Sequence, residues 1–287
     1  MMVSELISFL QKELTYIYES PELENIIFLL FEENLSWKRT DLVLRRAELI
    51  DAKTEAQFLS QLQRLKTSEP VQYVLGKTWF RGLKFIVNSH VLIPRPETEE
   101  LVEWIKNDFV QNKHAKNLLD IGTGSACIPV SLKKEFPSWN ISAIDFSREA
   151  LIVAKQNASM NSAEVQFIEK DFLNWSADSI ANRETWDILV SNPPYIPVSD
   201  RTTIADRVKN FEPSSALFVP DDDSLLFYRE IARYGNHFLR EKGMIYLEIN
   251  ENFAEQVSML FSHEGYPEIS LRKDMRGKDR LIRIRKK

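Results

Sequence analysis

The sequence predicts an α/β fold: a mostly parallel seven-stranded sheet with an antiparallel hairpin at one edge, preceded by a small helical bundle. Apolar residues in the first part of the chain recur at helical spacing. From about Glu97 onward, predicted strands and helices alternate, as is typical of a parallel sheet with helices on both faces. The last two predicted strands are separated only by a short turn at Gly277, which indicates an antiparallel pair.

Residues 1–70 form the predicted helical bundle. One apolar stripe at helical spacing covers residues 3–17, and a second covers residues 23–31. Thr54 and Gln57 fit a capping box, which predicts the start of a further helix. No group of polar residues in this region indicates chemistry, so a structural or partner-binding role is expected.

Residues 71–96 differ in composition from the bundle. They are rich in β-branched and aromatic side chains, and Gly76 and Gly82 interrupt them. This pattern predicts extended chain that forms a β-hairpin linker between the bundle and a third region, residues 97–287.

The region 97–287 contains the predicted sheet. Strands are expected at residues 117–119, 141–144, 165–168, 187–190 and 244–249, and the terminal hairpin at 268–273 and 280–285. Helices are expected between them, at residues 97–110, 127–136, 148–157, 224–238 and 252–262.

Composition excludes several classes of protein. The longest apolar run, residues 26–31, is far shorter than the roughly 20 residues of a membrane span. The single cysteine, Cys127, rules out an internal disulfide or a CxxC zinc site, and the four histidines are scattered, so no metal site is expected. A net charge of −5 speaks against broad nucleic-acid binding. We expect a cytoplasmic protein that needs neither nucleic acid nor a membrane; a monomer is expected, although no sequence feature fixes the oligomeric state.

Four predicted strands are followed by a polar side chain. These residues are Asp120, Asp145, Asp171 and Asn192. In open α/β sheets, ligands bind just beyond the carboxyl ends of the strands. The four side chains are therefore expected to line one crevice.

The first of these strands leads into the sequence DIGTGSA at residues 120–126. Gly122 and Gly124 would let the backbone turn tightly and approach a ligand, although a plain strand-to-helix turn has the same pattern. Asp145 could accept hydrogen bonds from both hydroxyls of a ribose. Asp171 and Phe172 could add a polar contact and an apolar wall; a helix cap and core packing are the alternatives for them.

The sequence SNPPYIP at residues 191–197 is the most informative segment. Two prolines directly after a buried strand remove two N–H donors and leave carbonyl oxygens facing a ligand. Asn192 adds a side-chain oxygen and Tyr195 an aromatic face. This set suits a planar –NH2 group, whose nitrogen it would orient. The alternative is a rigid surface loop.

Taken together, the glycine loop, the acidic second strand and N-P-P-Y resemble class I S-adenosylmethionine-dependent methyltransferases, which have a Rossmann-like fold. The resemblance is closest to the PrmC/HemK family of protein-(glutamine-N5) methyltransferases, which modify peptide-chain release factors. Three more segments resemble that family: LIPRPETE at 92–99, NFEP at 210–213 and SEPVQYVLG at 68–76. The resemblance extends from about residue 68 to the C-terminus.

The resemblance implies the cofactor S-adenosylmethionine, with S-adenosylhomocysteine as product, a release factor as protein substrate, and the roles of individual residues. Cofactor binding is expected of Asp120, Gly122, Thr123, Gly124, Ser125, Ala126, Asp145, Asp171, Phe172 and Asn192. Catalysis is expected of Asn192, Pro193, Pro194 and Tyr195, and substrate binding of Arg95, Glu97, Asn192, Pro193, Tyr195 and Glu212. Ala126 replaces a glycine common in the family, and it should be tolerated if its φ is helical. A structural ion pair that ties the hairpin to the domain is the alternative for Arg95 and Glu97.

Other functions remain open at this point. A ribosomal-protein glutamine methyltransferase, or an enzyme that methylates exocyclic amines of rRNA or DNA, would also act on planar nitrogen. An NAD(P) oxidoreductase would need a glycine where Cys127 stands, and it leaves N-P-P-Y unexplained. A non-catalytic interaction protein would make the bundle the working part.

Overall fold

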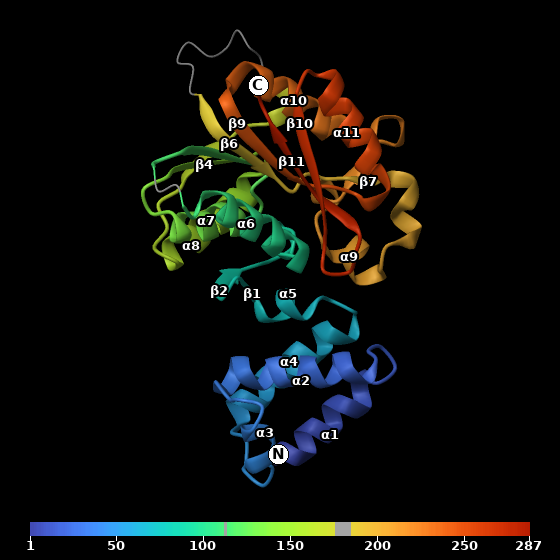
Figure 1. Cartoon of the computed structure of the whole chain (residues 1–287). Coiled ribbons are helices and arrows are strands. Elements are labelled where there is room, and N and C mark those ends of the chain that lie inside the picture. The colour runs from blue at the N-terminus through green and yellow to red at the C-terminus, as the bar shows by residue number, and fades with distance from the viewer. Residues whose placement is uncertain (112–113, 176–184) are drawn as a thin grey trace. The chain divides into compact units, whose positions relative to one another are not determined.

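The computed structural model describes residues 1–111, 114–175 and 185–287 (Figure 1). The chain divides into two compact units. The first comprises Met1–Lys77 and Ala205–Phe211, and the second comprises Thr78–Ile204 and Glu212–Lys287. In the described part of the chain, no helix is both long and apolar enough to cross a membrane.

The first unit is helical, as predicted. Its helices are α1 (Val3–Leu14), α2 (Ser20–Leu35), α3 (Asp41–Leu44), α4 (Ala52–Lys66), α5 (Val71–Leu75) and α9 (Asp206–Phe211). The two apolar stripes predicted from the sequence supply the buried faces of α1 and α2, which pack with Phe58, Leu62 and Leu65 of α4 into one apolar core.

Two predictions in this part of the chain are wrong. Helix α4 begins before the predicted capping box, because the carboxylate of Asp51 accepts hydrogen bonds from the N–H groups of Lys53 and Thr54. Residues 71–75, predicted as extended, form α5. Tyr73 and Val74 of this helix are buried, and Arg64 donates hydrogen bonds to both of their carbonyl oxygens, so tertiary contacts override the β-propensity of the segment.

The hairpin is shorter than predicted. It consists of β1 (Lys77–Phe80) and β2 (Leu83–Ile86), and residues 87–95 contain no strand. Asn157 of helix α8 (Arg148–Met160) holds it in place: its side chain accepts from the N–H of Ile86 at 2.6 Å and donates to the carbonyl oxygens of Ile86 and Ser125. The buried Asn157 thus fixes the hairpin to the loop after strand β3 (Asn117–Ile121).

The second unit contains the predicted seven-stranded sheet, in the order β10-β11-β9-β6-β3-β4-β5. Its strands are β3 (Asn117–Ile121), β4 (Asn140–Asp145), β5 (Gln166–Glu169), β6 (Trp186–Ser191), β9 (Leu239–Glu248), β10 (Glu268–Lys273) and β11 (Asp279–Arg285). The first five are parallel, and β11 pairs antiparallel with both β9 and β10. The antiparallel edge hairpin is therefore confirmed.

Helices cover both faces of this sheet (Figure 1). They are α6 (Pro96–Phe109), α7 (Cys127–Glu135), α8 (Arg148–Met160), α10 (Leu226–Phe238) and α11 (Ala254–His263). Adjacent strand residues alternate between two apolar clusters: Leu118 packs with α6, α7 and α8, whereas Leu119 packs with α10 and α11. Both faces are buried, as a parallel sheet requires.

The order in which the chain adds strands to the sheet reverses between β3 and β6, although the two strands are parallel. From β3 the chain proceeds outward through β4 to β5, and then returns to β6 on the other side of β3. Such a switch point leaves a crevice beyond the carboxyl ends of the two strands. A short parallel pair, β7 (Ile196–Pro197) with β8 (Phe218–Val219), lies after β6 in the chain.

Candidate active site

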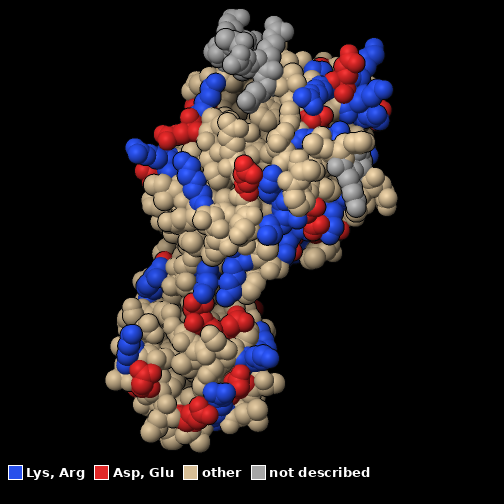
Figure 2. All heavy atoms as spheres, turned by 90° about the vertical axis from the view of Figure 1, so that its left-hand side faces the viewer, with Lys and Arg blue, Asp and Glu red and all other residues tan. Residues whose placement is uncertain are grey.

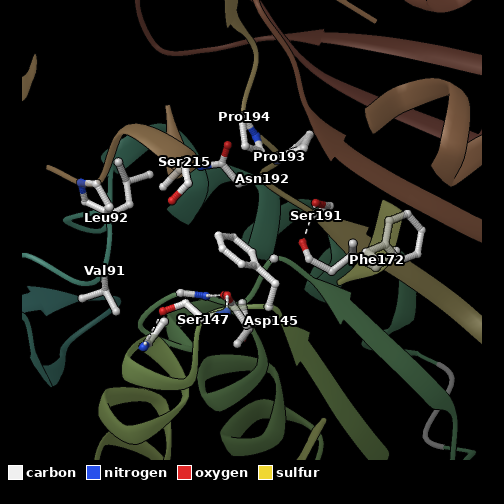
Figure 3. A pocket seen from close by; sticks show the side chains of 18 of the residues that line it. Val91, Leu92, Asp145, Ser147, Phe172, Ser191, Asn192, Pro193, Pro194 and Ser215 are labelled. Carbon is white, nitrogen blue, oxygen red and sulfur yellow. Dashed lines mark hydrogen bonds between the residues drawn. The ribbon is translucent and has the colours of Figure 1, made fainter. Parts of the chain in front are cut away.

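A cavity of about 600 Å³ opens at the switch point of the sheet. Its lining comes from the loops after β3, β4, β5 and β6, and from residues of the ranges 89–98 and 213–227. Figure 3 shows Asp145 and Ser147 on one side of this space and Asn192 and Pro193 across from them. The volume lies within the range of small-molecule sites.

Main-chain geometry shapes the part of the cavity after β3. Gly122 and Gly124 have φ values of +72° and +53°, a left-handed conformation that favours glycine. A Cβ atom at either position would meet no protein atom within 4 Å. Both residues line the cavity, so this open space is available to a ligand that approaches the backbone closely.

Asp145 links the glycine loop to the end of β4. Its carboxylate accepts from the N–H of Gly124 at 2.8 Å and from the N–H of Ser147 at 2.9 Å. Burial raises the pKa of this carboxyl group, and the backbone hydrogen bonds oppose that shift. A carboxylate has about four acceptor positions, so Asp145 can still accept from a ligand in the cavity.

Asp120 lies in β3, beneath the cavity lining rather than in it. Its side chain is buried, and neither carboxylate oxygen has a hydrogen-bond partner within the described part of the chain. Burial raises the pKa of Asp120 to about 7; the neighbouring Thr123 hydroxyl opposes this shift and the nearby Asp145 charge adds to it. An unsatisfied buried carboxylate next to a cavity favours a ligand that carries positive charge.

Ala126 does not have the helical φ on which its tolerance was expected to depend. Its φ is +62° and its ψ is 26°, so it is left-handed at the N-cap of α7, and its side chain is fully buried. For a non-glycine residue this conformation costs about 1–2 kcal/mol. The backbone thus keeps the shape that a glycine would adopt more easily.

Asp171 and Phe172 both line the cavity and also serve the structural roles considered for them. The Asp171 carboxylate accepts from the N–H of Leu173 at 3.0 Å and so caps the short turn Phe172–Asn174. Phe172 is buried and packs edge-on against Tyr234 of α10.

Asn192 is the first member of a chain of hydrogen bonds that leads from the cavity lining to the buried Glu248. Its Nδ2 donates to Oγ1 of Thr98 at 3.1 Å, and this hydroxyl donates to Oε2 of Glu248 at 2.7 Å. The other oxygen of Glu248 accepts from the hydroxyl of Tyr195 at 3.0 Å. Burial raises the pKa of Glu248, and the hydrogen bonds from Thr98 and Tyr195 oppose the shift.

Tyr195 is not part of the cavity lining, in contrast to Asn192, Pro193 and Pro194. Its ring packs against the apolar cluster that includes α10 and α11. Its backbone carbonyl oxygen accepts from Nδ2 of Asn250 at 3.2 Å. The packing of its ring on a substrate amide stays a prediction.

Arg95 forms an ion pair with Glu212, not with Glu97. Nη2 of Arg95 lies 2.5 Å from Oε1 of Glu212, and the N–H of Ile93 donates to Oε2 at 3.1 Å. Glu212 thereby joins the PRPE and FEP segments, with its side chain almost fully buried. Arg95 lines the cavity, whereas Glu97, in the first turn of α6, and Glu212 do not.

Two features of the site were missed by sequence reasoning. Glu248 could have been noticed as an acidic residue at the end of a predicted buried strand. Phe146, which follows Asp145, lines the cavity with 58% of its surface exposed, and an aromatic residue directly after the strand-end acid was the available signal. No cluster of His, Cys, Asp or Glu suited to a metal ion occurs among the residues described.

Comparison with known proteins agrees with this geometry. The chain matches two family descriptions, "PrmC N-terminal domain" over residues 5–76 and "Methyltransferase small domain" over residues 98–211. The second match contains the glycine loop, Asp145 and N-P-P-Y.

Curated relatives match over nearly the whole chain. The release factor glutamine methyltransferase of Flavobacterium psychrophilum is 42% identical and covers 94% of each chain. The protein of the same name from Bacteroides thetaiotaomicron is 37% identical and covers 98% of this chain and 99% of its own.

A solved structure supports the fold. A methyltransferase from Pyrococcus furiosus superposes with a TM-score of 0.51 at 16% identity, covering 82% of this chain and 99% of its own. The sheet order, the cavity at its switch point and the match along almost the entire chain lead to one conclusion: this chain belongs to the release factor glutamine methyltransferase family, a group of class I methyltransferases.

Proposed function

We propose that the protein transfers a methyl group from S-adenosylmethionine to the side-chain amide nitrogen of a glutamine in a peptide-chain release factor. The observation that carries this proposal is the setting of Asn192. Because its Nδ2 is engaged by Thr98, its Oδ1 remains to accept a hydrogen bond at the cavity, beside Pro193 and Pro194, which have no N–H groups. An edge made only of acceptors suits an –NH2 group.

The other side of the cavity fits the cofactor. Asp145 is placed to accept from ribose hydroxyls, and the glycines at 122 and 124 leave room for close approach. Phe146 and Phe172 offer apolar walls for an adenine ring, and the carboxylates of Asp120 and Asp145 favour a cationic molecule. S-adenosylmethionine, when bound, supplies an electrophilic methyl group on a sulfonium centre.

The protein's contribution to the chemistry is to orient a weak nucleophile. The lone pair of an amide nitrogen is delocalised into the carbonyl group. Hydrogen bonds from the amide hydrogens to Oδ1 of Asn192 and to the carbonyl oxygen of Pro193 would align that nitrogen and stabilise the positive charge that develops on it. The excess proton then leaves to water, so no strong base is required.

Family membership also bears on the alternatives. It excludes an NAD(P) oxidoreductase and a purely structural protein. The choice of a release factor glutamine over a ribosomal-protein glutamine or a nucleic-acid base is part of our proposal. The curated relatives are named release factor glutamine methyltransferases, which supports a release factor as the substrate. On the face shown in Figure 2, acidic and basic side chains are intermixed without a continuous basic patch, which speaks against a nucleic-acid substrate bound to that face. We place the reaction in the cytoplasm, where release factors act, and propose a monomeric enzyme.

Substrate choice can be tested directly. The protein and labelled S-adenosylmethionine are incubated in parallel with release factor, ribosomal protein and ribosomal RNA, and the modified residue is located by mass spectrometry. Label on a glutamine of the release factor is expected. Label only on RNA or only on ribosomal protein would reject the proposal.

The role of Asn192 is tested with Asn192→Ala. Because the variant loses an oriented acceptor at the reacting nitrogen, kcat should fall by about 10²–10³-fold. The thermal unfolding temperature should stay close to that of the unmodified protein, which separates loss of chemistry from loss of fold. Near-normal methylation by this variant would contradict the assignment.

A further inference from the structure

We propose that Glu248 is a positioning residue that fixes, through Thr98, which end of the Asn192 amide faces the cavity. The inference rests on the proposed function, because it concerns the acceptor that holds the substrate amide. Neither Glu248 nor Thr98 needs to touch the reacting atoms for this role.

The direction of each hydrogen bond follows from the chemistry of the groups. Glu248 accepts from two hydroxyls, Thr98 at 2.7 Å and Tyr195 at 3.0 Å, and these hydrogen bonds together with the nearby Arg280 charge favour its ionised form. An ionised carboxylate can only accept, so the single hydrogen of the Thr98 hydroxyl is committed to Glu248. The Thr98 oxygen can then only accept from its other neighbour. Asn192 must therefore present Nδ2 to Thr98, at 3.1 Å, and Oδ1 points the other way. A reversed amide would set two acceptors against each other.

The surroundings of the network keep this direction fixed. Thr98 and Glu248 are 2% and 1% exposed, so water does not compete for their hydrogen bonds. The second oxygen of Glu248 is held by the Tyr195 hydroxyl at 3.0 Å, which restrains rotation of the carboxylate. Three segments that are distant in sequence, at the start of α6, after β6 and at the end of β9, are thus coupled at one carboxylate.

A specific consequence follows for Thr98. Valine has nearly the shape of threonine but cannot accept a hydrogen bond from Nδ2. In Thr98→Val, therefore, neither orientation of the Asn192 amide is favoured over the other by a hydrogen bond at this position. Serine retains the hydroxyl and the polarity of the network. The pair Thr98→Val and Thr98→Ser therefore separates the hydrogen bond from the packing of the side chain.

The kinetic experiment measures methylation of release factor by the full-length protein and its variants. Thr98→Val should lower kcat by about 10- to 100-fold through loss of amide orientation, with KM for S-adenosylmethionine unchanged, and Thr98→Ser should restore most of the turnover. In an Asn192→Ala background, Thr98→Val should cause no further loss. Wild-type turnover in Thr98→Val, or an equal loss in both backgrounds, would overturn the inference.

A second measurement does not depend on the substrate. The side-chain NH2 signal of Asn192 in ¹⁵N NMR spectra should show one protected hydrogen in the wild-type protein and in Thr98→Ser, and loss of that protection in Thr98→Val. Equal protection in all three proteins would overturn the inference. If release factor is not methylated by the wild-type protein, the proposed function fails, and the NMR comparison still decides whether the Thr98 hydroxyl, through which Glu248 would act, orients the Asn192 amide.

Discussion

The two sides of the cavity are built in different ways. The side assigned to the cofactor comes largely from one continuous stretch, residues 120–147, and depends on main-chain conformation and backbone N–H groups. The side assigned to the substrate amide depends on side chains as far apart in sequence as Thr98 and Glu248, which are separated by 150 positions. The first should be sensitive to backbone geometry, and the second to the loss of single polar atoms.

The largest effect on stability is expected from Arg95→Ala on the amide side. It leaves the buried carboxylate of Glu212 without its cation, and because Arg95 is itself partly exposed we expect a loss of about 3 kcal/mol in the free energy of unfolding, the low end for a buried pair. Urea denaturation measures this. Arg285→Ala is the matched control: its partner Glu268 is mostly exposed, so the change should be below about 1 kcal/mol. Equal losses of unfolding free energy in the two variants would contradict the idea that the buried Arg95–Glu212 pair stabilises the fold more than an exposed ion pair does.

Asp120→Asn should stabilise the ligand-free protein at pH 8. The folded protein holds the Asp120 proton up to about pH 7, whereas the unfolded chain releases it near pH 4. Between these values the folded state binds more protons, so stability falls as pH rises. The variant lacks this cost, which is about 4 kcal/mol for a difference of about three pKa units. Its buried amide stays unsatisfied, which costs about 2 kcal/mol, so the net gain at pH 8 should be about 2 kcal/mol. Parallel stability–pH curves for the two proteins would refute the explanation.

Gly124→Ala tests the backbone side. At φ +53° an alanine should introduce about 1–2 kcal/mol of backbone strain, partly offset by the smaller freedom of alanine in the unfolded chain, about 0.4–1 kcal/mol, so the protein should be modestly destabilised. The alanine Cβ would occupy open space at the cavity, so affinity for S-adenosylhomocysteine should also fall. Gly277→Ala, at φ +79° in the turn between β10 and β11, carries a similar backbone cost away from the cavity. Calorimetric titration should show weaker binding only for Gly124→Ala. Unchanged affinity for S-adenosylhomocysteine in both variants would show that the ligand does not approach Gly124 closely.

The smallest change is expected for Ala126→Gly. Relief of the left-handed strain is offset by the greater freedom of glycine in the unfolded chain, about 0.4–1 kcal/mol, so stability should stay level or rise slightly. At a right-handed helical position the same substitution would destabilise by about 1 kcal/mol. The sign of the change in thermal denaturation therefore reports the conformation of this residue.

The same contrast explains what the sequence could reveal. Gly122, Gly124 and Asp145 are close in sequence and follow predicted strands, so local pattern and sheet topology were enough to group them. Pairs such as Thr98 with Glu248 and Arg95 with Glu212 arise only when distant segments pack, and no local pattern encodes them. Helix α5 was missed for a related reason: contacts from Arg64 outweigh the intrinsic preference of its residues.

Helix α9 carries a consequence for the modularity of the chain. It follows N-P-P-Y in sequence but packs with the N-terminal helices, where Arg207 pairs with Glu22, and the chain returns to the second unit at Glu212. The first unit is therefore built from two separate stretches of the chain, and a cut after Lys77 does not yield two complete units. A fragment that starts at Thr78 would carry α9 stripped of its packing partners. Grafting the bundle onto another methyltransferase would require the transfer of residues 205–211 as well.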